Sequence, residues 1–96
     1  MSHPAFKTAS GEIWTSAWVG DNAGRYEWAT ADGRLVVWCD SRRFEDDPAR
    51  GGRRAVHVYR ATLDGYASTI TWPTLLDAMA EAVRSRHKLD MRRAAA

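Results

Sequence analysis

Cys39 and His57 are the one pair of residues in this sequence with the chemistry of a nucleophilic thiol and its base. An imidazole that takes the proton of a thiol produces the thiolate that attacks electrophilic centres. The hydrophobic alternation, however, places Cys39 on a predicted core face and His57 below Trp72. We therefore expect a buried thiol and a packed histidine.

Metal binding and acid–base catalysis have weaker candidates. His3, His57 and His87 are too scattered to indicate a metal site. The adjacent carboxylates of residues 45–47 (Glu-Asp-Asp) fall in a predicted loop, which would not hold catalytic groups rigidly. The sequence thus predicts no enzymatic activity, no metal and no cofactor.

Two Asp-Gly pairs indicate the elements that position these residues. Asp-Gly between β-prone segments is a strong signal for a two-residue hairpin. Asp32-Gly33 pairs Trp28 with Val37, Glu27 with Trp38 and Arg25 with Asp40. This register gives a predicted core face of alternating residues, namely Tyr26, Trp28, Thr30, Leu35, Val37 and Cys39.

A two-residue turn at Asp64-Gly65 likewise determines which residues pair across the strands. It gives a second apolar face through the cross-strand pairs Leu63–Tyr66, Ala61–Ser68, Tyr59–Ile70 and His57–Trp72. The opposite side of these two strands is polar, which is typical of an antiparallel sheet covered on one face.

The first hairpin has an open register. Its loop, residues 20–24, allows either Val19 or Trp18 to lie opposite Tyr26. Because a slip of one residue exchanges the two faces of a strand, Trp14 and Trp18 have no assigned role at this point.

The cover of the sheet is a predicted helix over residues 73–88. Pro73 is tolerated in a first turn, and Thr74 with Asp77 matches a capping box. An apolar stripe at helical spacing follows, comprising Leu75, Leu76, Met79, Ala80 and Val83.

The predicted fold class is α+β, a meander of hairpins forming a five-stranded antiparallel sheet with one C-terminal helix on one face. The expected strands are 12–19, 25–30, 34–40, 54–62 and 66–72. We expect a flexible N-terminus over 1–11, one domain over 12–89 and a loose tail over 90–96.

The segment 40–54 has no hydrophobic periodicity and is predicted to be a long charged loop, a kind that is usually functional or disordered. Phe44 is its one aromatic residue and a candidate anchor. Its five arginines are candidate contacts to carboxylates or phosphates: Arg42, Arg43, Arg50, Arg53 and Arg54. The alternative is a mobile loop whose charges neutralise one another.

Trp38 is a further candidate contact, because the Asp32-Gly33 register places it on the face opposite the core. Exposed tryptophan is typical of interface anchors. The alternative is that the charged loop or the N-terminus covers it.

The basic residues near the C-terminus are the one candidate nucleic-acid site. Residues 84–93 carry a local charge of +4 from Arg84, Arg86, Lys88, Arg92 and Arg93 against Asp90, and the remaining residues sum to −2. The helix dipole also favours positive charge late in a helix without any ligand.

These observations predict a small non-enzymatic module that binds a protein partner, of the kind found among inhibitors such as phage anti-defence or toxin-immunity proteins. The alternative is a single-stranded nucleic-acid-binding protein that uses the basic helix end and exposed aromatics. The single cysteine favours the cytoplasm, and residues 1–12 contain no apolar run, so we expect no signal peptide and no membrane contact. The oligomeric state has no signal in the sequence.

Overall fold

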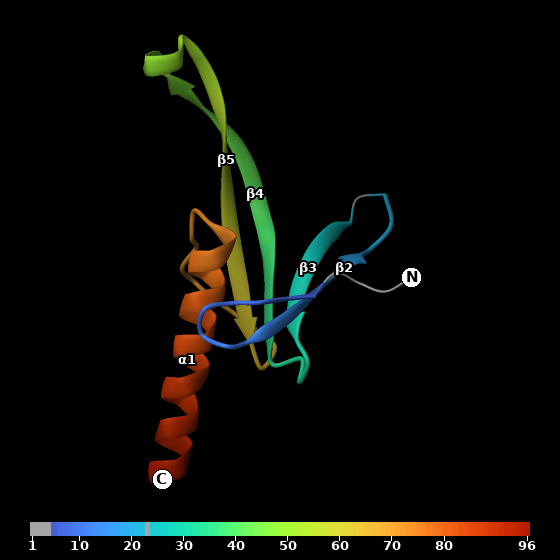
Figure 1. The fold of residues 1–96 in the computed structure, drawn as a ribbon, viewed down its shortest axis with the longest axis vertical. Coiled ribbons are helices and arrows are strands. Elements are labelled where there is room, and N and C mark those ends of the chain that lie inside the picture. The colour runs from blue at the N-terminus through green and yellow to red at the C-terminus, as the bar shows by residue number, and fades with distance from the viewer. Residues whose placement is uncertain (1–4, 23) are drawn as a thin grey trace.

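One antiparallel sheet and one helix make up the chain in a computed structural model, which describes residues 5–22 and 24–96 (Figure 1). The sheet order follows the chain order, as in a meander. The elements are β1 (Ala5–Lys7), β2 (Ile13–Val19), β3 (Arg25–Thr30), β4 (Leu35–Asp47), the short 3-10 turn η1 (Pro48–Arg50), β5 (Gly52–Leu63), β6 (Tyr66–Ala67) and α1 (Leu75–Ala95). The predicted α+β class is confirmed.

The short strand β1 is an addition to the predicted strands. It pairs with β2, with Ala5 opposite Thr15 and Lys7 opposite Ile13. The predicted flexible N-terminus is therefore ordered from Ala5 onward, while residues 1–4, including the candidate ligand His3, lie outside the described residues.

The Asp32-Gly33 hairpin has the predicted register, with Glu27 opposite Trp38 and Trp28 opposite Val37. Gly33 has φ of 72°. The Asp32 carboxylate accepts hydrogen bonds from the Thr30 hydroxyl at 2.7 Å and the Arg34 amide at 3.1 Å. These bonds, led by that of Thr30, lower the pKa of Asp32.

The first hairpin takes the five-residue loop, because Trp18 lies opposite Tyr26 and Val19 opposite Arg25. Trp14 therefore shares a face with the core residues of β3 and is fully buried. Trp18 lies on the same face, where it makes an edge-to-face contact with Tyr26.

The third hairpin follows the prediction only near its turn. Leu63 lies opposite Tyr66, and Asp64 and Gly65 both have positive φ, as this turn requires. Beyond Ala67 the strand breaks, and Trp72 pairs with Tyr59. The predicted pairs Tyr59–Ile70 and His57–Trp72 are therefore wrong, and Ile70 is exposed. The Ser68 hydroxyl donates to the Ile70 carbonyl at 2.8 Å, which stabilises the irregular segment.

The helix begins at its predicted cap, since the Thr74 hydroxyl accepts a hydrogen bond from the Asp77 amide at 3.1 Å. It starts at Leu75 instead of residue 73 and continues to Ala95, so the predicted loose tail is mostly helical. Leu75, Met79 and Val83 of the predicted stripe lie on the core as expected. Leu76 and Ala80 are exposed instead, and Ala78 and Ala82 are buried.

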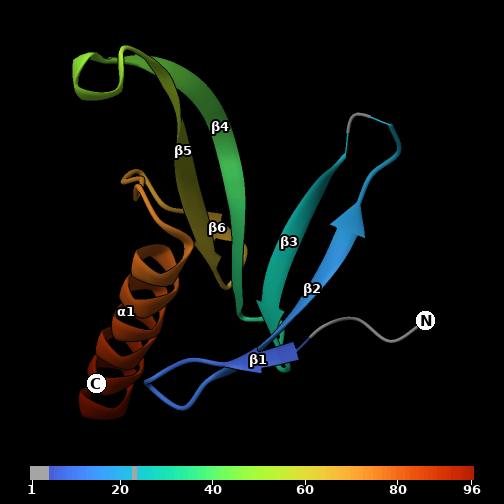
Figure 2. The same ribbon diagram turned by 45° about the horizontal axis from the view of Figure 1, so that its top comes forward.

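The core lies where α1 packs on β4 and β5. Its buried members are Trp14, Leu35, Val37, Ala61, Ala78, Met79 and Ala82. The β2–β3 hairpin diverges from β4 and β5 beyond the shared base (Figure 2). Tyr26, predicted on the core face, is consequently exposed, because α1 does not reach that far along the sheet.

Candidate partner-binding site

The predicted loop 40–54 is replaced by a long two-stranded hairpin. β4 and β5 continue to pair from Ser41 opposite Val58 to Asp47 opposite Gly52. We call residues 41–58 the arm. Among the described residues no further strand pairs with the arm, and Figure 1 shows it extending past the first turn of α1.

A bulge at Asp40 separates the arm from the core part of β4. The register shifts between Cys39, opposite Tyr59, and Ser41, opposite Val58, so that Asp40 is left without a partner across the ladder. A bulge of this kind bends and twists a strand. The extra residue also frees the Asp40 carboxylate to pair with Arg60 at 3.4 Å. The predicted pair of Asp40 with Arg25 is therefore wrong.

Phe44 is the large apolar side chain of the arm. It lies opposite Ala55, and strand alternation places it on the same face as Arg42 and His57, which is the face that carries the core further along. Its exposed fraction is 58%. An aromatic side chain that is exposed on a projecting hairpin is placed as an interface anchor would be.

Four of the five arm arginines have carboxylate partners, although five arginines against the three carboxylates of residues 45–47 leave the arm with a net charge of +2. Arg43 and Arg54 both pair with Glu45, at 3.0 and 3.6 Å. The remaining pairs are Arg53 with Asp46 and Arg50 with Asp47, each at 3.7 Å. In the part of the chain that the structure describes, Arg42 has no carboxylate within 4.0 Å.

Trp38 is buried, so the interpretation of this residue as an exposed anchor is wrong. Its exposed fraction is 6%. The Arg25 guanidinium lies 4.2 Å from the centre of a Trp38 ring. The indole nitrogen donates to Asp40 at 3.4 Å, and Arg60 lies directly opposite on β5. Long charged side chains thus bury an aromatic residue on the face that α1 does not cover.

The basic residues of α1 are partly committed to ion pairs within the protein. Arg86 pairs with Glu12 and, at 3.8 Å, with Asp32. Arg84 pairs with Glu81 at 2.6 Å. Lys88 and Arg92 have no acidic partner within 4.0 Å among the described residues, whereas Arg93 lies 3.7 Å from Asp64. Arg86 therefore links α1 to the segment before β2 and to the turn between β3 and β4.

Cys39 and His57 lie next to each other, which the sequence did not indicate. The thiol sulfur is 3.6 Å from His57 Nδ1, and both residues are half-buried. The imidazole stacks on Tyr59, with 6.3 Å between ring centres. Burial, and secondarily Cys39, raises the pKa of the Tyr59 hydroxyl. The face of His57 is thus occupied by a ring, and no carboxylate orients its imidazole in the part of the chain that the structure describes.

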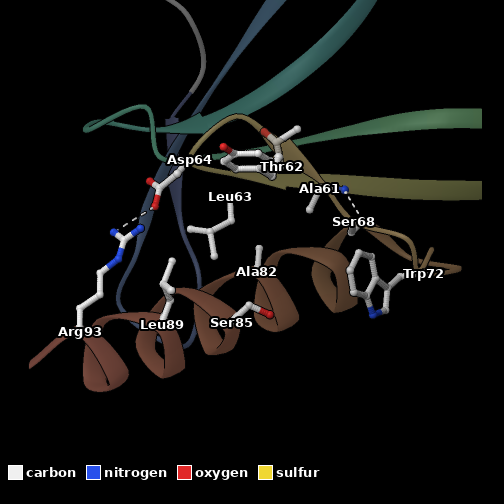
Figure 3. Close-up of a pocket in the computed structure, with 11 residues that line it drawn as sticks. Ala61, Thr62, Leu63, Asp64, Ser68, Trp72, Ala82, Ser85, Leu89 and Arg93 are labelled. Atoms are coloured by element: carbon white, nitrogen blue, oxygen red, sulfur yellow. Dashed lines mark hydrogen bonds and ion pairs between the residues drawn. The ribbon is translucent and has the colours of Figure 1, made fainter. Parts of the chain in front are cut away.

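A cleft between α1 and the end of β5 is the feature that sequence reasoning missed (Figure 3). It has a volume of about 310 Å³. Apolar side chains from the two elements form its walls, and Asp64 and Arg93 lie at one end. No group of three or more metal-ligating side chains occurs among residues 5–22 and 24–96.

Comparison of the sequence with models of protein families gives no match, and comparison with curated proteins and with solved structures gives none either. The helix of the described chain is not apolar enough to cross a membrane.

Proposed function

We propose that this protein is a non-enzymatic module that binds another protein through the arm. The observation that supports this most is the exposed Phe44 on a two-stranded hairpin that projects beyond the core. A two-stranded hairpin without a covering layer is marginally stable in water. The arm would therefore gain stability by packing against a partner.

The charge arrangement of the arm supports a protein partner over a nucleic acid. Binding of nucleic acids depends on arginines and lysines that neutralise phosphates. In the arm, Glu45, Asp46 and Asp47 already pair with four arginines, so a polyanion would meet these carboxylates as well. A protein surface that carries both signs of charge complements such a hairpin better.

Inhibition of a protein complex, of the phage anti-defence or toxin-immunity type, is the role that we propose for this binding. The support is a projecting hairpin that can enter a cleft of a larger protein. The cytoplasm is the proposed location, because the half-buried thiol of Cys39 stays reduced there.

The proposal is tested by replacing the anchor. Phe44→Ser removes the exposed ring without touching the buried core. Immobilised wild-type protein and the variant are exposed to a nuclease-treated native lysate, and captured proteins are quantified by mass spectrometry. We expect a defined partner to be captured by the wild type and its capture to fall about tenfold or more with Phe44→Ser.

Met91→Ser is the matched control, because Met91 is similarly exposed at 61% but lies on α1. It should capture the partner as the wild type does. Equal capture by the Phe44 variant would contradict the proposal. The capture is also carried out from an untreated lysate. A partner that is captured from the untreated lysate and lost after nuclease treatment would favour the nucleic-acid alternative.

A further inference from the structure

The cleft between α1 and β5 exists because small residues face each other across it. Ala61 on β5 and Ala82 on α1 form part of its lining, and Ser85 lies one helical turn further along (Figure 3). Larger apolar side chains, among them Leu63, Leu89 and Trp72, form the rest of its walls. A volume of about 310 Å³ lies at the lower end of the range for small-molecule sites.

The two charged groups at the end of the cleft differ in the number of hydrogen bonds that they make. Both oxygens of Asp64 accept hydrogen bonds from Arg34, at 2.8 and 3.1 Å. Arg93, by contrast, makes no hydrogen bond within the described residues, and its nearest carboxylate oxygen, on Asp64, is 3.7 Å away. Its side chain is 65% exposed. The cleft therefore ends at a guanidinium with unused donors, beside a carboxylate whose two oxygens each accept a hydrogen bond from Arg34.

We propose that this cleft binds a small apolar monocarboxylate, such as a medium-chain fatty acid, with its hydrocarbon chain against Ala61, Ala82 and Trp72 and its carboxylate on Arg93. A guanidinium binds a carboxylate through two parallel hydrogen bonds, and the apolar walls remove the chain from water. An ammonium head group would have to share Asp64 with Arg34, which already donates to both of its oxygens.

This site is separate from the proposed partner-binding function. No residue of the arm lines the cleft. The binding of a carboxylate and the binding of a protein through Phe44 can therefore fail independently.

The experiment is calorimetric titration of the 96-residue chain with sodium decanoate below its micelle concentration. Decanol and decyltrimethylammonium, which have the same chain with a neutral or a cationic head, are titrated in parallel. We expect saturable binding of decanoate at one site, with weaker binding of decanol and least of the cation.

Two variants test separately the contact of Arg93 with the charged head group and the space in the cleft for the hydrocarbon chain of the ligand. Arg93→Gln should weaken decanoate binding about tenfold and leave decanol unchanged. Arg92→Gln is the matched control, since Arg92 is the adjacent basic residue and does not line the cleft. Ser85→Phe, at an exposed helix position, should fill the cleft and abolish both.

Absence of saturable binding of decanoate to the wild type would overturn the proposal. It would also be overturned if the cation bound as tightly as decanoate, or if Arg93→Gln and Arg92→Gln had equal effects. Thermal unfolding of each variant establishes that it is folded before it is titrated.

Discussion

Arg34 and Asp90 are 56 positions apart in the sequence and form a two-point ion pair, with Nη1–Oδ2 and Nη2–Oδ1 distances of 3.0 and 2.9 Å. The same guanidinium binds Asp64. One side chain therefore joins the turn before β4, the turn after β5 and the C-terminal half of α1. The helix is thus held at this end by charge, while its first half is held by the apolar core.

The cluster predicts a loss of stability in acid. Hydrogen bonds from Arg34 are the main cause that lowers the pKa of both Asp64 and Asp90 below the usual value, and they also raise the pKa of Arg34. A carboxyl whose pKa is lower in the folded state stabilises the fold above its unfolded pKa, about 3.9. This contribution is lost as the pH falls through the lower folded values. Urea unfolding at pH 6 and at pH 3 measures it.

Arg34→Gln should reduce this difference between pH 6 and pH 3. Arg53→Gln is its matched control, since the partner of Arg53 is the highly exposed Asp46. An unchanged acid dependence in the Arg34 variant would show that the cluster does not stabilise the fold.

Much of the fold was predictable because its signals are local. The turn at Asp64-Gly65 and the cap at Thr74 depend on residues that are neighbours in the sequence, and both are confirmed. The arm was missed because its charged residues stand in runs along each strand, which leaves no alternation of apolar and polar residues there. Glu45 lies opposite Arg54 and Asp46 opposite Arg53, a complementarity that becomes visible only with the register.

The environment of Trp38 and the cleft depend on contacts that are distant in sequence. Arg25 covers Trp38 from the neighbouring strand, and a flexible cation has no hydrophobic period that would predict this. The cleft arises from small residues, Ala61 and Ala82, on separate elements. Small side chains that face each other on two separate elements produce no pattern in the sequence of either element.

Trp38→Ala should destabilise the protein by about 3 kcal/mol or more, because it removes a buried indole and leaves a cavity. Alanine substitution of an exposed anchor would instead leave the free energy of unfolding nearly unchanged. Trp18→Ala is the control, since Trp18 is about half exposed and should cost much less. Equal urea midpoints for the wild type and the Trp38 variant would contradict the burial of this side chain.

Backbone amides in the arm should exchange with solvent faster than those of Leu35 to Trp38 by roughly two orders of magnitude or more, because exposed ion pairs add little stability. Bound partner should slow exchange in the arm. Hydrogen exchange followed by mass spectrometry measures both. Equal protection of the arm and the core strands in the free protein would contradict this view.

Binding of single-stranded DNA or RNA should be negligible at about 0.15 M salt, since Arg84 and Arg86 already pair with carboxylates. Arg86→Ala should instead lower the free energy of unfolding by roughly 1–3 kcal/mol. Fluorescence anisotropy with labelled oligonucleotides tests the first statement and urea unfolding the second. Submicromolar, salt-sensitive binding would support the nucleic-acid alternative.

Shortening the arm tests the proposed function most directly. In this variant residues 42–57 are replaced by Asn-Gly, so that Ser41 and Val58, which lie opposite each other, are joined by a two-residue turn. The core retains its residues, and the melting temperature should stay close to that of the wild type. We predict that capture of the partner from a nuclease-treated lysate is lost. Undiminished capture by the folded, shortened protein would contradict binding through the arm.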